Sequence, residues 1–220
     1  MSLYKFSSES TTSNLPLSSS LFTQLQTDIL SGRIRSGEKL TEQKICEKYN
    51  VSRTPVREAL RQLEMDGLVE SIPNRGAHVI GFSEQDVSDI YQLRKIYEVQ
   101  AVCWAIERIT DEELDALEET FEFMEFYTMK KDSEKMLNIN MHFHQLIYSA
   151  AKNRMLQHLL SSYQIYTKHI KKTSTKEDNL PVILEEHRAI FEAFKMRDVE
   201  AGAKAMAIHM DNTKARAQGK

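Results

Sequence analysis

Three arginines recur every four residues in one helix-like segment: Arg53, Arg57 and Arg61. At about 100° per residue they lie on one flank of a helix, and apolar residues occupy the other flank. Guanidinium groups bind phosphate oxygens and the edges of guanine bases, so the stripe indicates a nucleic-acid surface. The same spacing is also typical of a solvated helix face whose arginines pair with acids, here Glu58 and Glu64.

The second candidate for chemistry is a set of histidines in the later part of the chain. His144 follows Asn140 by four residues, so both share one face of a helix. His187 and His209 lie at nearly equal distances from a break at Arg197-Asp198, and two antiparallel helices joined there would place them opposite each other. Converging imidazoles favour a metal ion between them, although a single histidine on an apolar face is more often a core residue.

The segments around the arginines indicate how they are positioned. Two helices precede Arg53, at residues 17–33 and, after an N-cap at Thr41, up to Tyr49. The arginine helix itself spans Arg53 to Met65. The period then changes to two short strand-like runs at residues 68–72 and 77–80, joined by a turn at residues 73–76. This order predicts an N-terminal winged helix-turn-helix with a small β-hairpin wing.

The rest of the chain has helical periodicity throughout. Capping-box patterns at Ser83 and Thr110 mark two helix starts. The expected helices span about residues 84–109, 112–130, 132–151, 153–173, 181–196 and 198–215. The predicted fold class is therefore mainly α, with a C-terminal all-α helical bundle. The predicted domains are a flexible polar tail (1–16), the winged helix-turn-helix (17–81), the helical domain (82–215) and a short tail (216–220).

Composition restricts the class of protein. The chain has 220 residues, 41% hydrophobic and 28% charged, with only 7 glycines and 4 prolines, which argues against an all-β or glycine-loop nucleotide fold. The absence of a long apolar stretch argues against a membrane partner, and the polar N-terminus leads us to expect a cytoplasmic protein. The net charge of −3 means that any DNA surface must come from local clustering.

Helix-turn-helix geometry assigns roles to the arginine helix. Its N-terminal end enters the major groove, so we expect Arg53, Thr54 and Arg57 to reach base edges. Arg61 lies further along and is expected near a phosphate. Ser52, together with the exposed helix N-terminus, is a second candidate for phosphate binding.

Residues 18–81 resemble the DNA-binding domain of GntR-type bacterial transcriptional regulators. The resemblance is carried by VSRTPVREAL at residues 51–60, DGLV at 66–69 and PNRG at 73–76. It implies that Arg53, Thr54, Arg57 and the wing glycine, Gly76, contact double-stranded operator DNA. Arg75 is placed like a wing residue that enters the adjacent minor groove. Some members of the family carry a DNA-contacting arginine where this chain has Gln43, so that contact is altered or absent here.

Most of residues 84–212 resemble the FCD effector-binding domain. The resemblance rests on Arg94-x3-Glu98, Asn140-x2-Phe143-His144, Asn153, Glu186-His187 and His209. Many FCD domains bind a divalent metal through three histidines at the positions of His144, His187 and His209 and through an aspartate four residues before the first. Here Asn140 replaces that aspartate. An amide oxygen still coordinates zinc, nickel or manganese, but it adds no negative charge, so metal affinity should fall.

Arg94 is the candidate effector-binding residue. A guanidinium facing the bundle interior would hold the carboxylate of a small organic acid through two hydrogen bonds. An ion pair with Glu98, four residues later, is an equally good interpretation of the same spacing.

The leading functional hypothesis is a ligand-responsive transcription factor that is not an enzyme, with repression as the expected outcome. Residues 82–215 would bind the effector and form a homodimer, so that two heads reach two half-sites. One alternative is a metal-dependent hydrolase built on the histidines, disfavoured because HEXXH spacing is absent and no acid clearly adjoins them. Another is a metal sensor, weakened by the missing aspartate.

Overall fold

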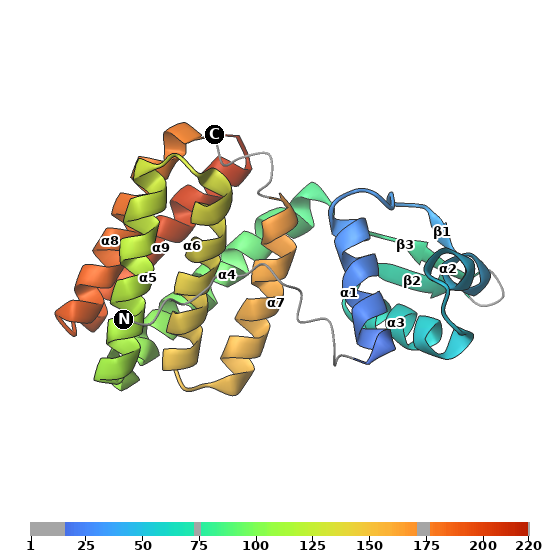
Figure 1. Cartoon of the computed structure of the whole chain (residues 1–220), viewed down its shortest axis with the longest axis horizontal. Helices are drawn as coiled ribbons and strands as arrows, with labels where there is room; N and C mark the ends of the chain where they lie inside the picture. Colours follow the sequence, from blue (N-terminus) through green and yellow to red (C-terminus); the bar gives the residue numbers. More distant parts are fainter. Residues whose placement is uncertain (1–15, 73–75, 171–176, 220) are drawn as a thin grey trace. The chain divides into compact units, whose positions relative to one another are not determined.

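The computed structural model describes residues 16–72, 76–170 and 177–219. The chain divides into two compact units, one through Phe82 and one from Ser83 onward. Both are mainly helical, and three short strands belong to the first (Figure 1). The predicted fold class is confirmed. No helix of the described segments is long and apolar enough to span a membrane.

The first unit is a three-helix head with a small sheet. Its elements in chain order are α1 (Leu17–Leu30), β1 (Lys39–Leu40), α2 (Glu42–Tyr49), α3 (Arg53–Met65), β2 (Val69–Ile72) and β3 (Gly76–Val79). Helix α3 buries Val56, Ala59 and Leu63 completely, and these pack in one core with Leu25 of α1 and Leu68. Burial of one face of α3 leaves its other flank for solvent.

Local capping fixes the helix-turn-helix. The Thr41 hydroxyl accepts a hydrogen bond from Lys44 N at the start of α2. Asn50 ends α2 in the left-handed conformation (φ 51°), which asparagine tolerates better than most residues. The chain therefore turns sharply into α3, which begins directly after Ser52.

The sheet differs from the predicted hairpin by one strand. Strand β3 pairs antiparallel with β2 and also with β1, so the strand order is β1-β3-β2. Two residues are too few for a periodicity signal, which is why the sequence did not indicate β1. Helix α1 also ends at Leu30, earlier than expected, and Gly32 with φ +73° follows it.

The second unit is the predicted helical bundle. It contains α4 (Glu84–Arg108), α5 (Asp111–Met129), α6 (Ser133–Ala150), α7 (Arg154–Ile170), a 3₁₀ turn η2 (Glu177–Asn179), α8 (Leu180–Lys195) and α9 (Val199–Ala217). The capping boxes at Ser83 and Thr110 both form. Helix α9 continues two residues past the expected end, to Ala217.

Long α4 packs against several other helices of the bundle. It packs along α9 in antiparallel fashion, since Lys95 pairs with Asp211 while the far end of α4 contacts Gly202. It also contacts α6 and α7. Two charged residues of α4, Arg94 and Glu98, are buried among these helices (3% and 0% exposed). Buried charges require polar partners, so we expect polar side chains around Arg94 and Glu98 inside the bundle.

Candidate nucleic-acid interface and metal centre

The N-terminal end of α3 presents the predicted DNA-contacting residues to solvent. Ser52, Arg53, Thr54 and Arg57 are all exposed. Ser52 is the N-cap of α3, and its side chain makes no capping hydrogen bond. The first backbone N–H groups of the helix therefore stay available for a phosphate, in a position that the helix dipole also favours.

The three arginines of the stripe differ in how they are paired. Arg57 Nε donates to Glu42 Oε1 across the turn between α2 and α3, at 2.8 Å. Arg61 bonds Glu58 through both Nε (3.1 Å) and a terminal nitrogen (2.7 Å) on the same helix. No hydrogen bond or ion pair within the described residues involves Arg53. The solvated-face interpretation thus fits Arg61 best, with Glu58 but not Glu64 as its partner.

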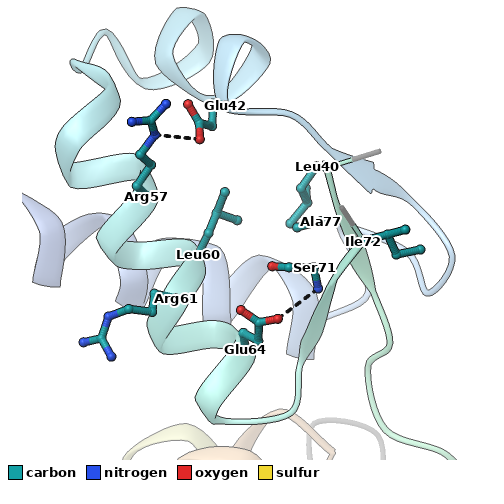
Figure 2. A pocket seen from close by; sticks show the side chains of 10 residues that line it. Leu40, Glu42, Arg57, Leu60, Arg61, Glu64, Ser71, Ile72 and Ala77 are labelled. Carbon is teal, nitrogen blue, oxygen red and sulfur yellow. Dashed lines mark hydrogen bonds and ion pairs between the residues drawn. The ribbon is translucent and has the colours of Figure 1, made fainter. Parts of the chain in front are cut away.

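A groove of about 410 Å³ lies between α3 and the sheet. Figure 2 shows Arg57 and Glu42 at one end of it and Glu64 at the other, with Arg61 directed away from the strands. The Glu64 carboxylate accepts a hydrogen bond from Ser71 N at 3.1 Å, which ties α3 to β2. Apolar side chains line the groove between these polar ends: Leu40, Leu60, Ile72 and Ala77.

The wing begins at Gly76, whose backbone requires glycine. Its φ is +85°, and a Cβ atom there would lie 3.2 Å from Leu40 O. Glycine thus permits β3 to lie close against β1. Arg75, the other predicted wing residue, lies outside the described residues.

In the second unit, three histidines from three helices converge. His144 of α6, His187 of α8 and His209 of α9 each offer a ring nitrogen, and these nitrogens lie within 4.8 Å of one another. All three side chains are buried (3%, 0% and 2% exposed). His142 and His158, by contrast, are exposed.

Each of these histidines has its Nδ1 atom next to an oxygen acceptor. His144 Nδ1 lies 3.0 Å from Glu98 Oε2, and His209 Nδ1 lies 2.8 Å from Glu186 Oε2. His187 Nδ1 lies 2.7 Å from the carbonyl oxygen of Ile183. Carboxylate and carbonyl oxygens only accept, so the proton of each neutral ring belongs on Nδ1. The Nε2 atoms then face the interior of the cluster, and those of His144 and His187 lie 3.3 Å apart.

The two glutamates are held in the charged form. Burial alone would raise the pKa of Glu98, but the adjacent His144 and Arg94 side chains and the hydrogen bonds it accepts hold that pKa well below its usual range. Burial opposes ionisation of Glu186 too, yet hydrogen bonds from Arg216 and His209 lower its pKa to about 2. Both carboxylates therefore stay acceptors.

Arg94 forms the ion pair with Glu98 that its spacing allowed. One terminal nitrogen lies 2.5 Å from Glu98 Oε1, and the other donates to Thr167 Oγ1 of α7 at 2.8 Å. The Tyr148 hydroxyl donates to the same Glu98 oxygen. Glu98 thus links α4 to α6 at the edge of the histidine cluster, and Arg94 extends this network to α7.

Three buried polar atoms at this level have no hydrogen-bond partner in the described part of the chain: Tyr91 Oη, Arg94 Nε and Asn140 Oδ1. Burial raises the pKa of Tyr91 to about 12, so its hydroxyl is a donor. Buried polar atoms are usually satisfied, which makes these three candidates for contact with a ligand or an ion.

The direction of the helices places these atoms on one side of the cluster. Glu98 meets His144, and further along Arg108 bonds the carbonyl of Ala151, so α4 and α6 run in the same direction here. Arg94 precedes Glu98 on α4 by four residues, and Asn140 precedes His144 on α6 by four residues. Both therefore lie one helical turn before the Glu98–His144 contact, on the same side of it.

The expectation that no acid adjoins the histidines is wrong, because Glu98 lies against His144 and Glu186 lies against His209. The spacing of Glu98 predicts its contact with Arg94, whereas its contact with His144 depends on how α4 packs on α6. The contact of Glu186 with His209 could have been predicted from the sequence. The antiparallel pairing that sets His187 opposite His209 also brings Glu186, the residue before His187, close to His209.

Two family models match the chain. The model described as "Bacterial regulatory proteins, gntR family" matches residues 17–79, and the FCD domain model matches residues 89–212. The chain is 31% identical over 194 residues to the HTH-type transcriptional regulator YdhC of Bacillus subtilis, covering 87% of this chain and 86% of that protein. It is 26% identical to the HTH-type transcriptional repressor RspR of Escherichia coli, covering 89% and 86%.

Solved structures show the same fold. E. coli McbR/YncC superposes with a TM-score of 0.75 at 23% identity, covering 94% of this chain and 99% of that chain. A GntR regulator from Rhodococcus superposes with a TM-score of 0.64 at 22% identity, covering 92% and 97%. These likenesses concern the architecture of the chain.

Proposed function

This chain belongs to the GntR family of bacterial regulatory proteins and carries an FCD domain, and from this premise we propose that it is a cytoplasmic, ligand-responsive repressor. Its relatives are transcription regulators and not enzymes, and two of them are named as repressors, RspR and the gluconate operon repressor of Bacillus licheniformis. The specific proposal is that the helical unit binds a small organic acid and that this binding alters operator affinity.

The head supports operator binding through the exposed start of α3. The part of the helix that enters a major groove carries Arg53, Thr54 and Arg57. The helix N-terminus after Ser52 has no side-chain cap, so its backbone N–H groups suit a phosphate. One such head contacts few base pairs, so a homodimer that binds two half-sites is the expected species.

A divalent metal fits the histidine cluster. The observation that supports this assignment is that each Nδ1 lies against an oxygen while the three histidines bring ring nitrogens within 4.8 Å of one another. A cation there would relieve their repulsion, and hydrogen bonds donated by the ring Nδ1–H groups to carboxylates, here Glu98 and Glu186, are typical of metal-bound histidines. Asn140 Oδ1, which has no hydrogen-bond partner among the described residues, would supply a fourth ligand atom. Zinc, nickel and manganese are the candidate ions, and the bound ion would coordinate an oxygen of the effector.

An organic acid fits the remaining polar atoms. Arg94 Nε and Tyr91 Oη are buried donors without acceptors among the described residues, and both lie on the face of α4 that carries Glu98. A carboxylate is the simplest ligand that satisfies two such donors. Arg94 would then be shared between Glu98, Thr167 and the effector.

The test is a DNA-binding assay with metal and acid varied separately. A duplex selected in vitro by the full chain from a random library serves as the operator, and fluorescence anisotropy measures affinity. We expect small carboxylic acids to weaken binding in the presence of zinc, and His144→Ala to abolish this response while His158→Ala retains it. A response to zinc alone would instead support a metal sensor. Absence of any effect of zinc or acids would contradict the proposal.

A further inference from the structure

The ion pair between Arg57 and Glu42 leaves one edge of the guanidinium available. Glu42 Oε1 accepts from Nε at 2.8 Å, and the described residues offer no hydrogen bond to the two terminal nitrogens. Arg61 provides the contrast within the same helix, because Glu58 takes Nε and one terminal nitrogen and Met65 Sδ lies 3.0 Å from the other. Among the three arginines of α3, and within the described part of the chain, Arg57 is the one whose guanidinium is held by a carboxylate and keeps both terminal nitrogens available.

An anchored guanidinium suits base reading. The two terminal N–H groups form the edge that pairs with O6 and N7 of guanine, and this pairing requires a defined plane. An exposed arginine otherwise samples many rotamers, and ordering it costs free energy at binding. A carboxylate on Nε restricts that motion before DNA arrives, so less is lost on docking.

Glu42 is itself held in place. It is the first residue of α2, directly after the Thr41 cap, and it is half-buried. Ile45 of the same helix is buried in the head core, which fixes α2 against α3. Figure 2 shows the Glu42 carboxylate facing the Arg57 guanidinium across the gap between the two helices. The acid is therefore part of the rigid frame, and the arginine is the group it orients.

We propose that Glu42 is a positioning residue that orients Arg57 for specific base recognition, so that an acid on the DNA-binding face increases specificity. This inference rests on the proposed operator binding. A carboxylate near DNA repels phosphates, so a purely electrostatic role predicts that its removal strengthens binding to every sequence. Positioning predicts opposite effects on specific and non-specific DNA, and the two roles are therefore distinguishable.

The experiment compares the full-length chain and its variants on the selected duplex and on a scrambled duplex of equal composition. Glu42→Ala is expected to weaken binding to the selected duplex about tenfold and to leave binding to the scrambled duplex unchanged or stronger. Glu70→Ala, which removes an exposed acid from β2 of the same head, controls for charge and should not weaken either complex. Glu42→Gln keeps an oxygen acceptor and should recover part of the specific affinity.

Coupling to Arg57 completes the test. In an Arg57→Ala background, Glu42→Ala should no longer reduce specific affinity, because no guanidinium is left to orient. Equal strengthening of both complexes by Glu42→Ala would overturn the inference and leave operator binding intact. A specific loss that persists in the Arg57→Ala background would overturn it as well. A wild-type chain that prefers no duplex in the selection would overturn both the inference and the proposed function. Melting curves of each variant identify any loss through unfolding.

Discussion

Glu98 Oε2 lies 3.0 Å from Nδ1 of His144, and this contact connects the buried charge of α4 to the histidine cluster. The other Glu98 oxygen accepts from Arg94 and Tyr148. One carboxylate thus stabilises a buried arginine and fixes the tautomer of a proposed metal ligand. The two roles explain why a charge is retained at a position with no exposure to solvent.

Glu98→Gln should destabilise the bundle by about 3–5 kcal/mol, because it leaves Arg94 buried without its counter-ion. Chemical denaturation of the full chain measures this, with attention to the transition of the second unit. Glu107→Gln, an exposed acid on the same helix, should change stability little. Similar stability of the two variants would contradict the assigned role of the ion pair.

Glu186→Gln should reduce zinc affinity by about 10–100-fold, since a carboxylate behind a metal-bound histidine raises its basicity and orients the ring. Calorimetric titration with zinc is the measurement. Glu185→Gln, at the neighbouring exposed position, is the matched control and should bind like the wild type. Equal losses in both variants would argue against a role for the His209 contact.

Asn140→Asp should strengthen metal binding by roughly tenfold, because a charged oxygen holds a divalent cation better than an amide does. The gain should be larger for manganese than for zinc, since manganese prefers carboxylate ligands. Asn138→Asp adds the same charge at an exposed position of α6 and should have little effect. If the two variants bind both metals alike, Asn140 is not a ligand.

Gly202→Ala should destabilise the chain by about 1–3 kcal/mol even though alanine favours helices. A Cβ atom there would overlap Ile106 Cδ1 and lie 2.9 Å from Val102 Cγ1, where α9 packs on α4. Ile106→Val removes the nearer methyl group, so the double variant should recover part of the loss. Thermal unfolding of the single and double variants decides the point, and a stabilising Gly202→Ala would refute it.

Arg53→Ala should cost about 1–3 kcal/mol on the selected duplex and much less on scrambled DNA. Arg61→Ala should weaken both complexes alike and reduce the salt dependence by about one counterion, if Arg61 leaves Glu58 to bind a phosphate. Anisotropy titrations at several salt concentrations separate these outcomes. An Arg61→Ala variant with unchanged affinity and salt slope would show that the Glu58 pair persists in the complex.

The helices of this protein could be predicted from its sequence because helix formation depends on residues that are close together in the chain. The spacing of Val56, Ala59 and Leu63 indicated both the buried face of α3 and the exposed arginine flank, and the patterns at Ser83 and Thr110 marked helix starts that the structure contains. Even the pairing of His187 with His209 followed from two antiparallel helices of similar length.

Contacts between distant segments were decided only by tertiary packing. The sequence suggested Glu58 and Glu64 as partners of the arginine stripe, and Glu58 does pair with Arg61. Arg57 instead pairs with Glu42, because α2 packs against α3 in the folded head. Strand β1 forms because its two residues pair with the edge of β3 that β2 does not occupy. Glu98 meets His144 because α4 and α6 pack side by side, and helix periodicity specifies the face of a residue but not which helix covers that face.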